Sequence, residues 1–430
     1  MLSSDEIRVV DSVWDQIWSS GITNPMTILD VISTVLMSYH MDETAVSDLR
    51  KYADGGDAKR LAETLFGVRR HYGIESGAEI EQTDFWQDTS SISIALDNLT
   101  PIVDRSGDVV GDIFERVLSR LSSAGHFGQF RTPHHIVEMM VDMVRPRSGE
   151  VILDPACGTG GFLIAASNFI NGGDGHFIGF EVDRTVARIA TANMVLHHVK
   201  SGEIRRTNGL TEALYQRPDV ILANPPFAGN VEAGVSRKVG LKTGKTELLF
   251  VASMMRNLKP GGRAAVVVPS GVLSSKSKAA MYLREMLLLD NHLEAVVELP
   301  ANVFSPYTGV KTGILIWKNE DHAGRRTRMI RINHDGFSLD SRRIPSEESD
   351  LHEAIRAYNG ENSNLSIDVS IADLRDESYN LTPSRYLPSV KEDRRDDVGG
   401  PQITEVIEEM SQLVDEISRS VREIRGLNNG

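Results

Sequence analysis

The sequence predicts an α/β protein with a mostly parallel central sheet, a helical region before the sheet and a helical tail after it. Three observations predict this fold class. Short apolar segments alternate with helical stretches from about residue 150 to 318, a pattern typical of parallel sheets that helices cover on both faces. Residues 1–124 show only helical spacing of apolar residues, and the chain ends in a heptad repeat.

Residues 1–124 are expected to form an N-terminal helical domain. Apolar side chains recur at helical spacing within residues 7–17 and again within residues 109–121. A glycine-rich break at 54–56 separates helical segments. Because the region offers no motif with a chemical interpretation, we interpret it as a packing or docking domain.

Residues 125–345 are expected to form a second domain, which contains the sheet. The apolar segments that read as strands are 151–154, 177–181, 219–223, 264–268, 295–299 and 314–318. The segments that read as helices are 162–170, 184–200, 246–257 and 279–289. In a sheet of this kind ligands bind at the carboxyl ends of the strands, so the functional residues should directly follow the strands.

Residues 346–430 are expected to form a C-terminal segment that is polar and turn-rich up to about residue 400. A helix is predicted over 402–425, because apolar residues there occupy the a and d positions of a heptad repeat. These residues are Ile403, Ile407, Met410, Val414, Ile417, Val421 and Ile424. Such a stripe needs a partner surface, which is either the chain's own domain or another subunit.

Composition excludes several classes of protein. Hydrophobic residues make up 40% of the 430 residues and charged residues 25%, which excludes global disorder. No apolar run reaches the roughly 20 residues that span a bilayer. The acidic, interrupted N-terminus does not read as a secretory signal, so we expect a cytoplasmic protein. Cys157 is the single cysteine, which excludes a disulfide framework and a multi-cysteine metal site, and no metal is expected.

The net charge of −14 argues against a protein that coats nucleic acid through bulk electrostatics, because binding to phosphates needs clustered cations. A DNA enzyme with local basic loops remains compatible with this charge. Arg237, Lys238, Lys242 and Lys245 form such a cluster and are candidates for contacts with DNA. The alternative interpretation of this cluster is an ordinary solvated surface loop.

The first motif with a chemical interpretation is a glycine-rich turn between the first strand and the next helix. It contains Asp154, Ala156, Gly158, Thr159, Gly160 and Gly161. Glycine lets the backbone approach a ligand closely, and the N-terminus of a helix offers free N–H groups. The acid precedes the glycines, unlike the dinucleotide fingerprint, and suits a ligand with a cationic amine. S-adenosylmethionine, which carries an ammonium and a sulfonium charge, fits this requirement.

The second motif is Glu181 at the end of the next strand, 20 residues after Gly161. An acid at about this distance from a glycine turn can accept hydrogen bonds from the hydroxyl groups of a ribose. Alone, such a glutamate would be interpreted as a solvated strand end. Together with the glycine turn, it predicts a site for an adenosyl group.

The third motif is Asn224-Pro225-Pro226-Phe227, which follows the strand at 219–223. Proline restricts the residue before it to extended geometry, so the amide of Asn224 should be held rigidly at the strand end. Acceptors for both hydrogens of an aromatic amine would localise its lone pair and make the nitrogen nucleophilic. Phe227 can stack on a base that has been extracted from its helix. The alternative interpretation is a proline-rich loop that caps the strand.

With these motifs the sequence resembles the amino-group DNA methyltransferases, most closely the modification (M) subunits of type I restriction–modification systems. The resemblance extends from about residue 114 to residue 387. The matching segments are 126–133, 154–162, 224–227, 258–269, 303–312 and 379–386. Each segment is modestly specific by itself, and their order makes the combination highly specific.

The resemblance implies a Rossmann-like core of the class I S-adenosylmethionine-dependent methyltransferases, with adenine N6 in DNA as the target. It implies further cofactor residues around the methionine end, which are Gln129, Phe130, Arg131, Thr132, Pro133 and His134. Where the family usually has an acid that holds the adenine amine of the cofactor, this chain has Asn208, whose amide oxygen can accept the same bond. Phe304 or Tyr307 is a candidate for stacking on the second face of the target base.

The resemblance also implies partners. In type I systems a separate specificity (S) subunit reads the DNA, two M subunits clasp it, and a restriction (R) subunit is a further partner. The predicted heptad helix suits docking of this kind.

Two other functions stay open. A protein methyltransferase could act on a glutamine amide, which presents the same planar nitrogen, and a non-catalytic scaffold could keep the cofactor fold.

Overall fold

The computed structural model describes residues 2–22, 24–74, 89–105, 109–123, 132–171, 173–227, 229–305, 308–321, 326–340 and 342–388. The chain divides into two units, Met1–Leu387 and Pro388–Gly430. The helix predicted over 402–425 lies outside the described residues. None of the helices in the described ranges has the length and apolar character that a membrane span requires.

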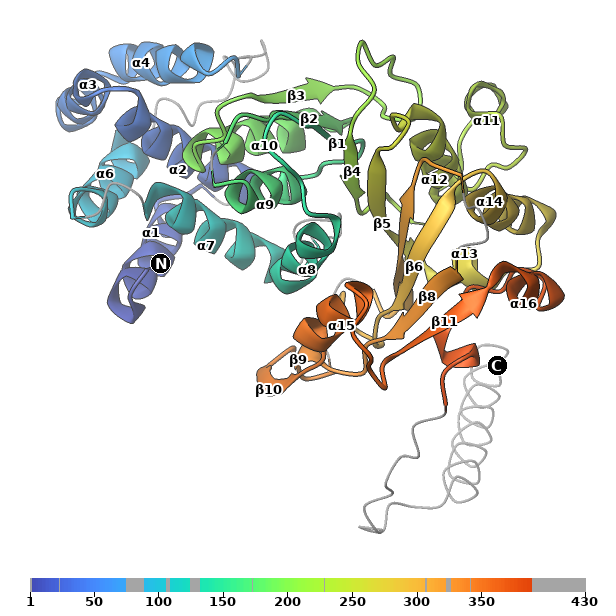
Figure 1. The fold of residues 1–430 in the computed structure, drawn as a ribbon. Coiled ribbons are helices and arrows are strands. Elements are labelled where there is room, and N and C mark those ends of the chain that lie inside the picture. Colours follow the sequence, from blue (N-terminus) through green and yellow to red (C-terminus); the bar gives the residue numbers. More distant parts are fainter. Residues whose placement is uncertain are drawn as a thin grey trace, which may run out of the picture. The chain divides into compact units, whose positions relative to one another are not determined.

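The first part of the chain is a bundle of helices, drawn in blue and cyan in Figure 1. These helices are α1 (Ser4–Ser19), α2 (Pro25–Met41), α3 (Glu43–Asp54), α4 (Ala58–His71), α6 (Thr89–Val103) and α7 (Val110–Ser123). Helix α1 begins at a capping box, in which Ser3 and Glu6 bond to each other's backbone N–H groups. Val13 and Ile17 of the predicted stripe are fully buried in the core of the bundle. The predicted helical character of this region is confirmed.

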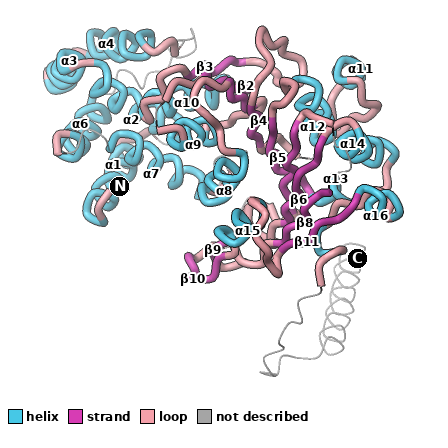
Figure 2. The backbone as a smooth tube through the Cα atoms, viewed as in Figure 1, coloured by secondary structure: helices cyan, strands magenta, loops and turns pink. Residues whose placement is uncertain are grey.

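A single large sheet forms the centre of the first unit (Figure 2). Its strands are β1 (Val151–Asp154), β2 (His176–Glu181), β3 (Gly202–Arg206), β4 (Val220–Ala223), β5 (Arg263–Pro269), β6 (His292–Glu298), β7 (Thr312–Lys318), β8 (Arg326–Arg331) and β11 (Ser366–Ser370). The spatial order is β11-β8-β6-β7-β5-β4-β1-β2-β3. The run from β3 to β5 is parallel, whereas β7 is antiparallel to both of its neighbours. A small separate sheet pairs β9 (Asp335–Phe337) with β10 (Pro345–Ser349).

Helices cover both faces of the sheet, because adjacent residues of each central strand point into different cores. In β1, Ile152 packs in the core that contains α8 (His134–Val144), α9 (Gly161–Phe169) and α15 (Leu351–Tyr358). The next residue, Leu153, packs in the core of α12 (Thr246–Asn257), α14 (Lys278–Leu289) and α16 (Ile371–Asp376). Helix α10 (Arg184–Leu196) is shared, since it also contributes Ile189 to the core of the N-terminal bundle. The predicted doubly covered α/β fold is confirmed.

The predicted strands and helices agree with the structure to within a few residues at each end. The strand expected at 314–318 exists, but it runs antiparallel inside a sheet that is otherwise mostly parallel up to β8. The sheet also continues beyond residue 345, because β11 pairs with β8. Residues 1–387 form one compact unit, and the division of the chain at 124 and 345 stays a prediction.

Candidate active site

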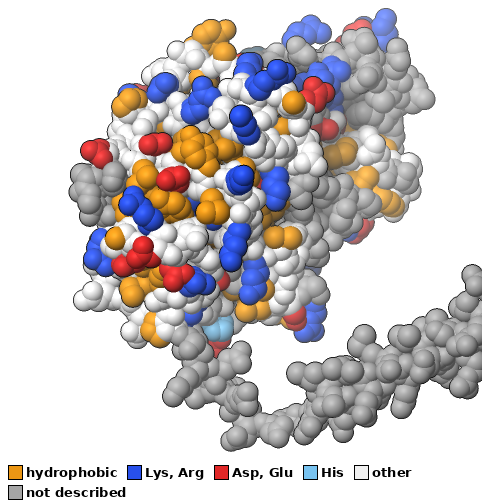
Figure 3. Space-filling view, turned by 90° about the vertical axis from the view of Figure 1, so that its right-hand side faces the viewer, with side chains coloured by type: hydrophobic (Ala, Val, Ile, Leu, Met, Phe, Trp, Pro, Cys, Tyr) orange, Lys and Arg blue, Asp and Glu red, His pale blue; other side chains and the backbone are white. Residues whose placement is uncertain are grey.

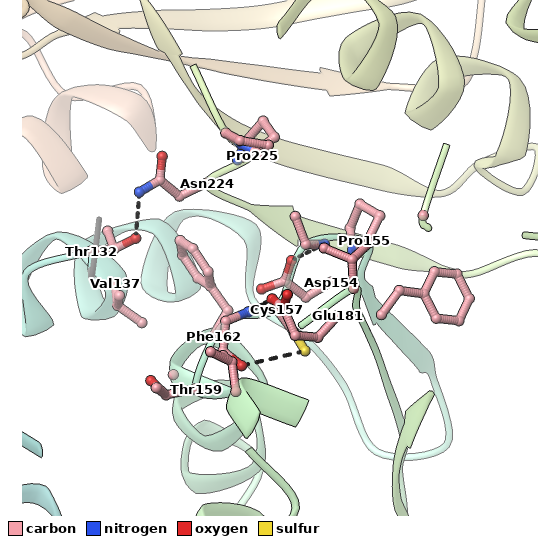
Figure 4. A pocket seen from close by; sticks show the side chains of 18 of the residues that line it. Thr132, Val137, Asp154, Pro155, Cys157, Thr159, Phe162, Glu181, Asn224 and Pro225 are labelled. Atoms are coloured by element: carbon pink, nitrogen blue, oxygen red, sulfur yellow. Dashed lines mark hydrogen bonds between the residues drawn. The ribbon is translucent and has the colours of Figure 1, made fainter. Parts of the chain in front are cut away.

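A cavity of about 510 Å³ opens at the carboxyl ends of β1, β2 and β4 (Figure 4). It lies between β1 and β4, where the chain order of the strands reverses, and this is where open α/β sheets bind their ligands. The predicted residues that line the cavity are Thr132, His134, Asp154, Ala156, Gly158, Thr159, Gly161, Glu181, Asn208, Asn224, Pro225, Pro226 and Phe227. Pro133 and Gly160 are their chain neighbours at the starts of α8 and α9. Gln129, Phe130 and Arg131 lie outside the described residues.

The glycine turn is held in a conformation that only glycine adopts readily. Gly158 and Gly160 have φ angles of 52° and 85°, which are strained for any residue with a side chain. The N–H of Gly160 donates to the carbonyl of Cys157 at 2.8 Å, and helix α9 begins at the next residue. Burial raises the pKa of the Cys157 thiol well above its usual value, so this cysteine fills space and is not a nucleophile.

Two carboxylates face the same end of the cavity. Asp154 is almost completely buried, and its Oδ1 accepts the N–H of Ala156 at 3.0 Å. Glu181 accepts the N–H of Asp183 at 2.9 Å and that of Gly158 at 3.2 Å. Burial raises the pKa of Asp154 to about 8, with a further contribution from the neighbouring Glu181 carboxylate. Burial also raises the pKa of Glu181. A bound cation would replace the lost hydration of this acidic pair.

The amide of Asn224 is oriented by a residue that is distant in sequence. Its Nδ2 donates to the hydroxyl of Thr132 at 2.9 Å, a contact drawn as a dashed line in Figure 4. Its Oδ1 is buried and has no hydrogen-bond partner among the described residues. Because Pro225 follows directly, the backbone at Asn224 is also restricted. The arrangement presents a fixed, unused acceptor at the wall of the cavity, which fits a ligand with an N–H donor.

The other predicted residues vary in how well they match their expected roles. Phe227 lines the cavity beside Asn224. Asn208 also lines it, but its Oδ1 already accepts the N–H of Leu210 at 3.0 Å, so one lone pair is in use. Phe304 is buried in the core and does not line the cavity, and Tyr307 lies outside the described residues.

Several lining residues were not predicted from the sequence. Most are apolar, and these include Val137, Phe162, Val182, Leu210 and Phe250. Their patterns are those of ordinary core residues, so no signal distinguished them. Glu115 and Leu118 of α7 also line the cavity, although the N-terminal bundle was expected to have no part in the site.

The predicted basic cluster lies on a closed loop, which we call the flap (residues 229–246). Arg237 and Lys238 belong to α11 (Ala233–Val239), and Lys242 and Lys245 follow it. All four side chains are exposed, and none lines the cavity. The ends of the flap are joined by hydrogen bonds from Val231 N–H to Gly244 and from Thr246 N–H to Gly229. Gly229 fits there because a Cβ would lie 2.4 Å from the Thr246 hydroxyl oxygen.

The face of the molecule that carries α11 and α14 is shown in the space-filling view (Figure 3). Lys and Arg side chains are spread over this face, with apolar patches between them. Lys238 is partly anchored, because its ammonium donates to the carbonyl of Thr211 at 3.0 Å. A protein with a net charge of −14 therefore still presents cations near the Asn-Pro-Pro-Phe segment.

Comparisons with known proteins agree with this geometry. A family model described as N-6 DNA methylase matches residues 105–395. The chain is 37% identical over 224 residues to the type I restriction enzyme EcoEI methylase subunit of Escherichia coli, which covers 48% of this chain and 46% of the relative. It is 30% identical over 289 residues to the StySJI methylase subunit of Salmonella typhimurium, which covers 61% and 53%. The chain thus spans about half the length of these curated relatives.

Solved structures show the same architecture. The type I restriction-modification system methyltransferase subunit from Streptococcus thermophilus superposes with a TM-score of 0.72 over 90% of this chain and 100% of that chain. Sequence identity in this comparison is 18%, so the likeness concerns the fold.

Proposed function

Because the chain belongs to the N-6 DNA methylase family, we propose that it transfers a methyl group from S-adenosylmethionine to N6 of adenine in DNA. We assign it the role of the methylation subunit of a type I restriction–modification system, acting on DNA in the cytoplasm. The observation that carries the proposal is the buried Oδ1 of Asn224, which has no partner among the described residues and is held at the cavity wall by Thr132.

The donor set of the cavity suits S-adenosylmethionine. Asp154 and Glu181 can offer negative charge to a ligand that carries an ammonium and a sulfonium group, and burial, which raises the pKa of both carboxyl groups, makes a cationic partner favourable. In this proposal Glu181, which lines the cavity, accepts bonds from the ribose hydroxyls, and the second lone pair of Asn208 Oδ1 accepts the adenine amine. The turn at Gly158 lets the backbone approach the ligand.

In the proposed reaction the cofactor supplies an electrophilic methyl group on a cationic sulfur. The Oδ1 of Asn224 accepts a hydrogen bond from the exocyclic amine of adenine, which localises the nitrogen lone pair and makes the amine nucleophilic. Thr132 keeps the amide in this orientation. Phe227 stacks on the base after it has left the helix. As the N–CH3 bond forms, the S–CH3 bond would break and its electron pair would stay on the sulfur, which becomes neutral. The methylated nitrogen would then carry the positive charge and lose a proton to solvent, so no strong base is required. Most of the acceleration comes from proximity and orientation.

The proposed partners are DNA, a specificity (S) subunit, a second M subunit and a restriction (R) subunit. The exposed cations of the flap support contacts with DNA phosphates. The heptad stripe predicted over 402–425 supports docking to another subunit. The type I methylase names of the curated relatives support the same assignment.

The test is the substitution Asn224→Ala in the full chain, purified with its specificity subunit. We expect cofactor binding to stay within about twofold of the native protein and methylation of DNA to fall by at least about a thousandfold, because the amine loses its acceptor. The control is Asn362→Ala, an exposed asparagine in the loop between α15 and β11, away from the cavity and the flap, which should methylate normally. Methylation of DNA by Asn224→Ala at the native rate would refute the mechanism, and methyl transfer to a protein amide instead of DNA would refute the substrate.

A further inference from the structure

Helix α10 touches the glycine turn through the side chain of Asn193. This residue is completely buried, and its Nδ2 donates to the carbonyl of Thr159 at 2.9 Å. Thr159 lies between Gly158 and Gly160, the two residues of the turn with positive φ. The bond therefore holds the middle of the loop that lines the cavity.

The same amide group also reaches the N-terminal bundle. Its Nδ2 donates to Oε1 of Glu115 on α7 at 3.4 Å. The partners are a carbonyl and a carboxylate, which both only accept hydrogen bonds, so the orientation of the amide is fixed by chemistry. The remaining atom, Oδ1, is buried without a partner among the described residues. A buried carbonyl without a donor destabilises a fold, and this cost favours a functional reason for an asparagine at this position.

Helix α10 is anchored in the N-terminal bundle rather than only in the sheet domain. Its residues Ile189, Ala192 and Leu196 belong to the core of the bundle. Arg188 donates to Asp30 of α2 at 3.1 Å, and this carboxylate also binds the buried Arg69.

The approach of α7 to α10 is close. A Cβ on Gly111 of α7 would lie 2.8 Å from the ring of His197, so any side chain there would force that ring to move. His197 in turn lies 3.9 Å from Glu115. Any shift of the bundle relative to α10 would consequently change the position of Glu115, and with it the partners of Asn193.

We propose that Asn193 is a positioning residue that holds the glycine turn in its cofactor-binding shape, and that Glu115 of the N-terminal bundle sets the orientation of Asn193. The proposal rests on the proposed function, because it takes S-adenosylmethionine as the ligand of the cavity. It gives the N-terminal bundle a part in cofactor affinity, and a partner that moves the bundle would alter the methyl-donor site through this contact.

The experiment is calorimetric titration of S-adenosylmethionine into the full chain and its variants. Asn193→Leu, which is similar in size and removes both donors, should raise the Kd by about tenfold. Thr191→Ala on the same helix is the control, because its hydroxyl bonds only within the helix, to Ala187 at 2.9 Å. Its Kd should not change.

A second measurement separates positioning from a general loss of stability. In the free protein, amide hydrogen exchange of residues 158–161 should become at least several-fold faster in Asn193→Leu, while exchange in β4 and β5 stays native. If Asn193→Leu does not fold, Glu115→Leu carries the test, and Glu115→Gln, which keeps an oxygen acceptor, should restore the native Kd to within about threefold.

A double-mutant cycle tests the role of Glu115, which also lines the cavity itself. If Glu115 acts through Asn193, Glu115→Leu should have no further effect in the Asn193→Leu background. Additive effects would overturn the link to the bundle, and a native Kd for Asn193→Leu would overturn the proposal for Asn193. A native chain that does not bind S-adenosylmethionine at all would instead refute the proposed function.

Discussion

At the residue scale, the contact between Thr132 and Asn224 joins two segments that are 92 residues apart in the chain. The hydroxyl of Thr132 accepts one amide hydrogen of Asn224, and the amide oxygen stays available for the proposed substrate amine. Thr132 thus orients the Asn224 amide without itself touching the atoms that would react. Fixing the orientation of a polar group before the reaction is a main source of rate acceleration in enzymes.

We expect Thr132→Val to lower kcat by about fivefold, because the loss of a neutral hydrogen bond costs about 1 kcal/mol and lets the Asn224 amide rotate. Valine keeps the shape of threonine, so kcat should fall by a larger factor than the KM for the cofactor rises. The matched control is Thr132→Ser, which keeps the hydroxyl and should retain most of the activity. Steady-state methylation kinetics measure kcat and the KM for the cofactor. A higher KM with an unchanged kcat in Thr132→Val would contradict the orienting role.

Asp154 leads to a prediction about pH. Burial raises its pKa to about 8 from a usual value of 3.8, so the free protein holds a proton at neutral pH that binding of a cationic ligand should release. The Kd for S-adenosylmethionine should therefore fall by up to about tenfold per pH unit as the pH rises toward about 8, and then level off. Titrations in two buffers of different ionisation enthalpy measure the released proton.

The raised pKa of Asp154 also makes the stability of the folded protein depend on pH. The folded protein keeps the proton on Asp154 between about pH 4 and 8, whereas the unfolded chain loses it. The contribution of this group to the free energy of unfolding is thus fully present below about pH 4 and is lost as the pH rises to about 8. Asp154→Asn should remove both the proton release and this part of the pH dependence. A native protein whose affinity is independent of pH would contradict the role of Asp154.

The residues at the strand ends could be predicted from the sequence, because the geometry of a parallel sheet brings them together. Parallel strands end at a common edge, so Asp154, Glu181 and Asn224 had to meet there. The contact of Thr132 with Asn224 and that of Asn193 with Thr159 could not be predicted, since each depends on the packing of helices that no local pattern specifies. For the same reason, Glu115 was missed as a lining residue.

At the element scale, a buried arginine explains how the segment at 379–386 is attached. The guanidinium of Arg284 on α14 donates to the carbonyls of Tyr379, Val272 and Ser275 at 2.6, 2.9 and 2.8 Å. Arg284 is 1% exposed, and burial lowers its pKa to about 10. One side chain thus ties the turn at Tyr379, directly after α16, to α13 (Ser270–Ser274) and to the loop after it.

We expect Arg284→Met to lower the free energy of unfolding by about 3 kcal/mol, because one buried and two partly buried carbonyls lose their donor. Arg375→Met is the matched control, since Arg375 on α16 is exposed, and its effect should stay within about 0.5 kcal/mol. Urea denaturation followed by circular dichroism measures both values. Equal effects of the two substitutions would show that the buried guanidinium is dispensable.

Among the elements, the buried strands were predicted well because their apolar runs are continuous. Strand β3 was missed because its sequence, Gly202–Arg206, is polar and lies at an exposed edge of the sheet. Strand β11 and helix α15 were missed because the segment after 335 reads as turns, and β11 is defined by its pairing with β8, about 40 residues earlier. The antiparallel direction of β7 depends on the path of the connecting loop, which apolar patterns do not report.

At the scale of the whole molecule, the cavity and the three buried cores all lie in the unit Met1–Leu387. The heptad stripe predicted over 402–425 is separate from these cores in sequence. The sequence thus predicts a docking role for a part of the chain that supplies none of the described residues around the cavity. It did not reveal that the N-terminal bundle supplies lining residues.

A chain that ends at Pro388 should bind S-adenosylmethionine with the native Kd but fail to co-purify with its specificity subunit, because the proposed docking stripe is removed. A finer test is Met410→Glu, which puts a charge into the stripe, with Gln412→Glu outside the a and d positions as its control. Pull-down from co-expressing cells measures the association. Full association of the shortened chain would refute the docking role of this segment.

The closed ends of the flap have a consequence for how such a surface can change. The two ends of the flap, Gly229 and Thr246, are held together by a backbone hydrogen bond. The loop between them can therefore vary in length at a small cost in conformational entropy. The flap could therefore be replaced by a loop of another length or sequence, which would change the proposed contacts with DNA while the residues that line the cavity at β1, β2 and β4 stay in place.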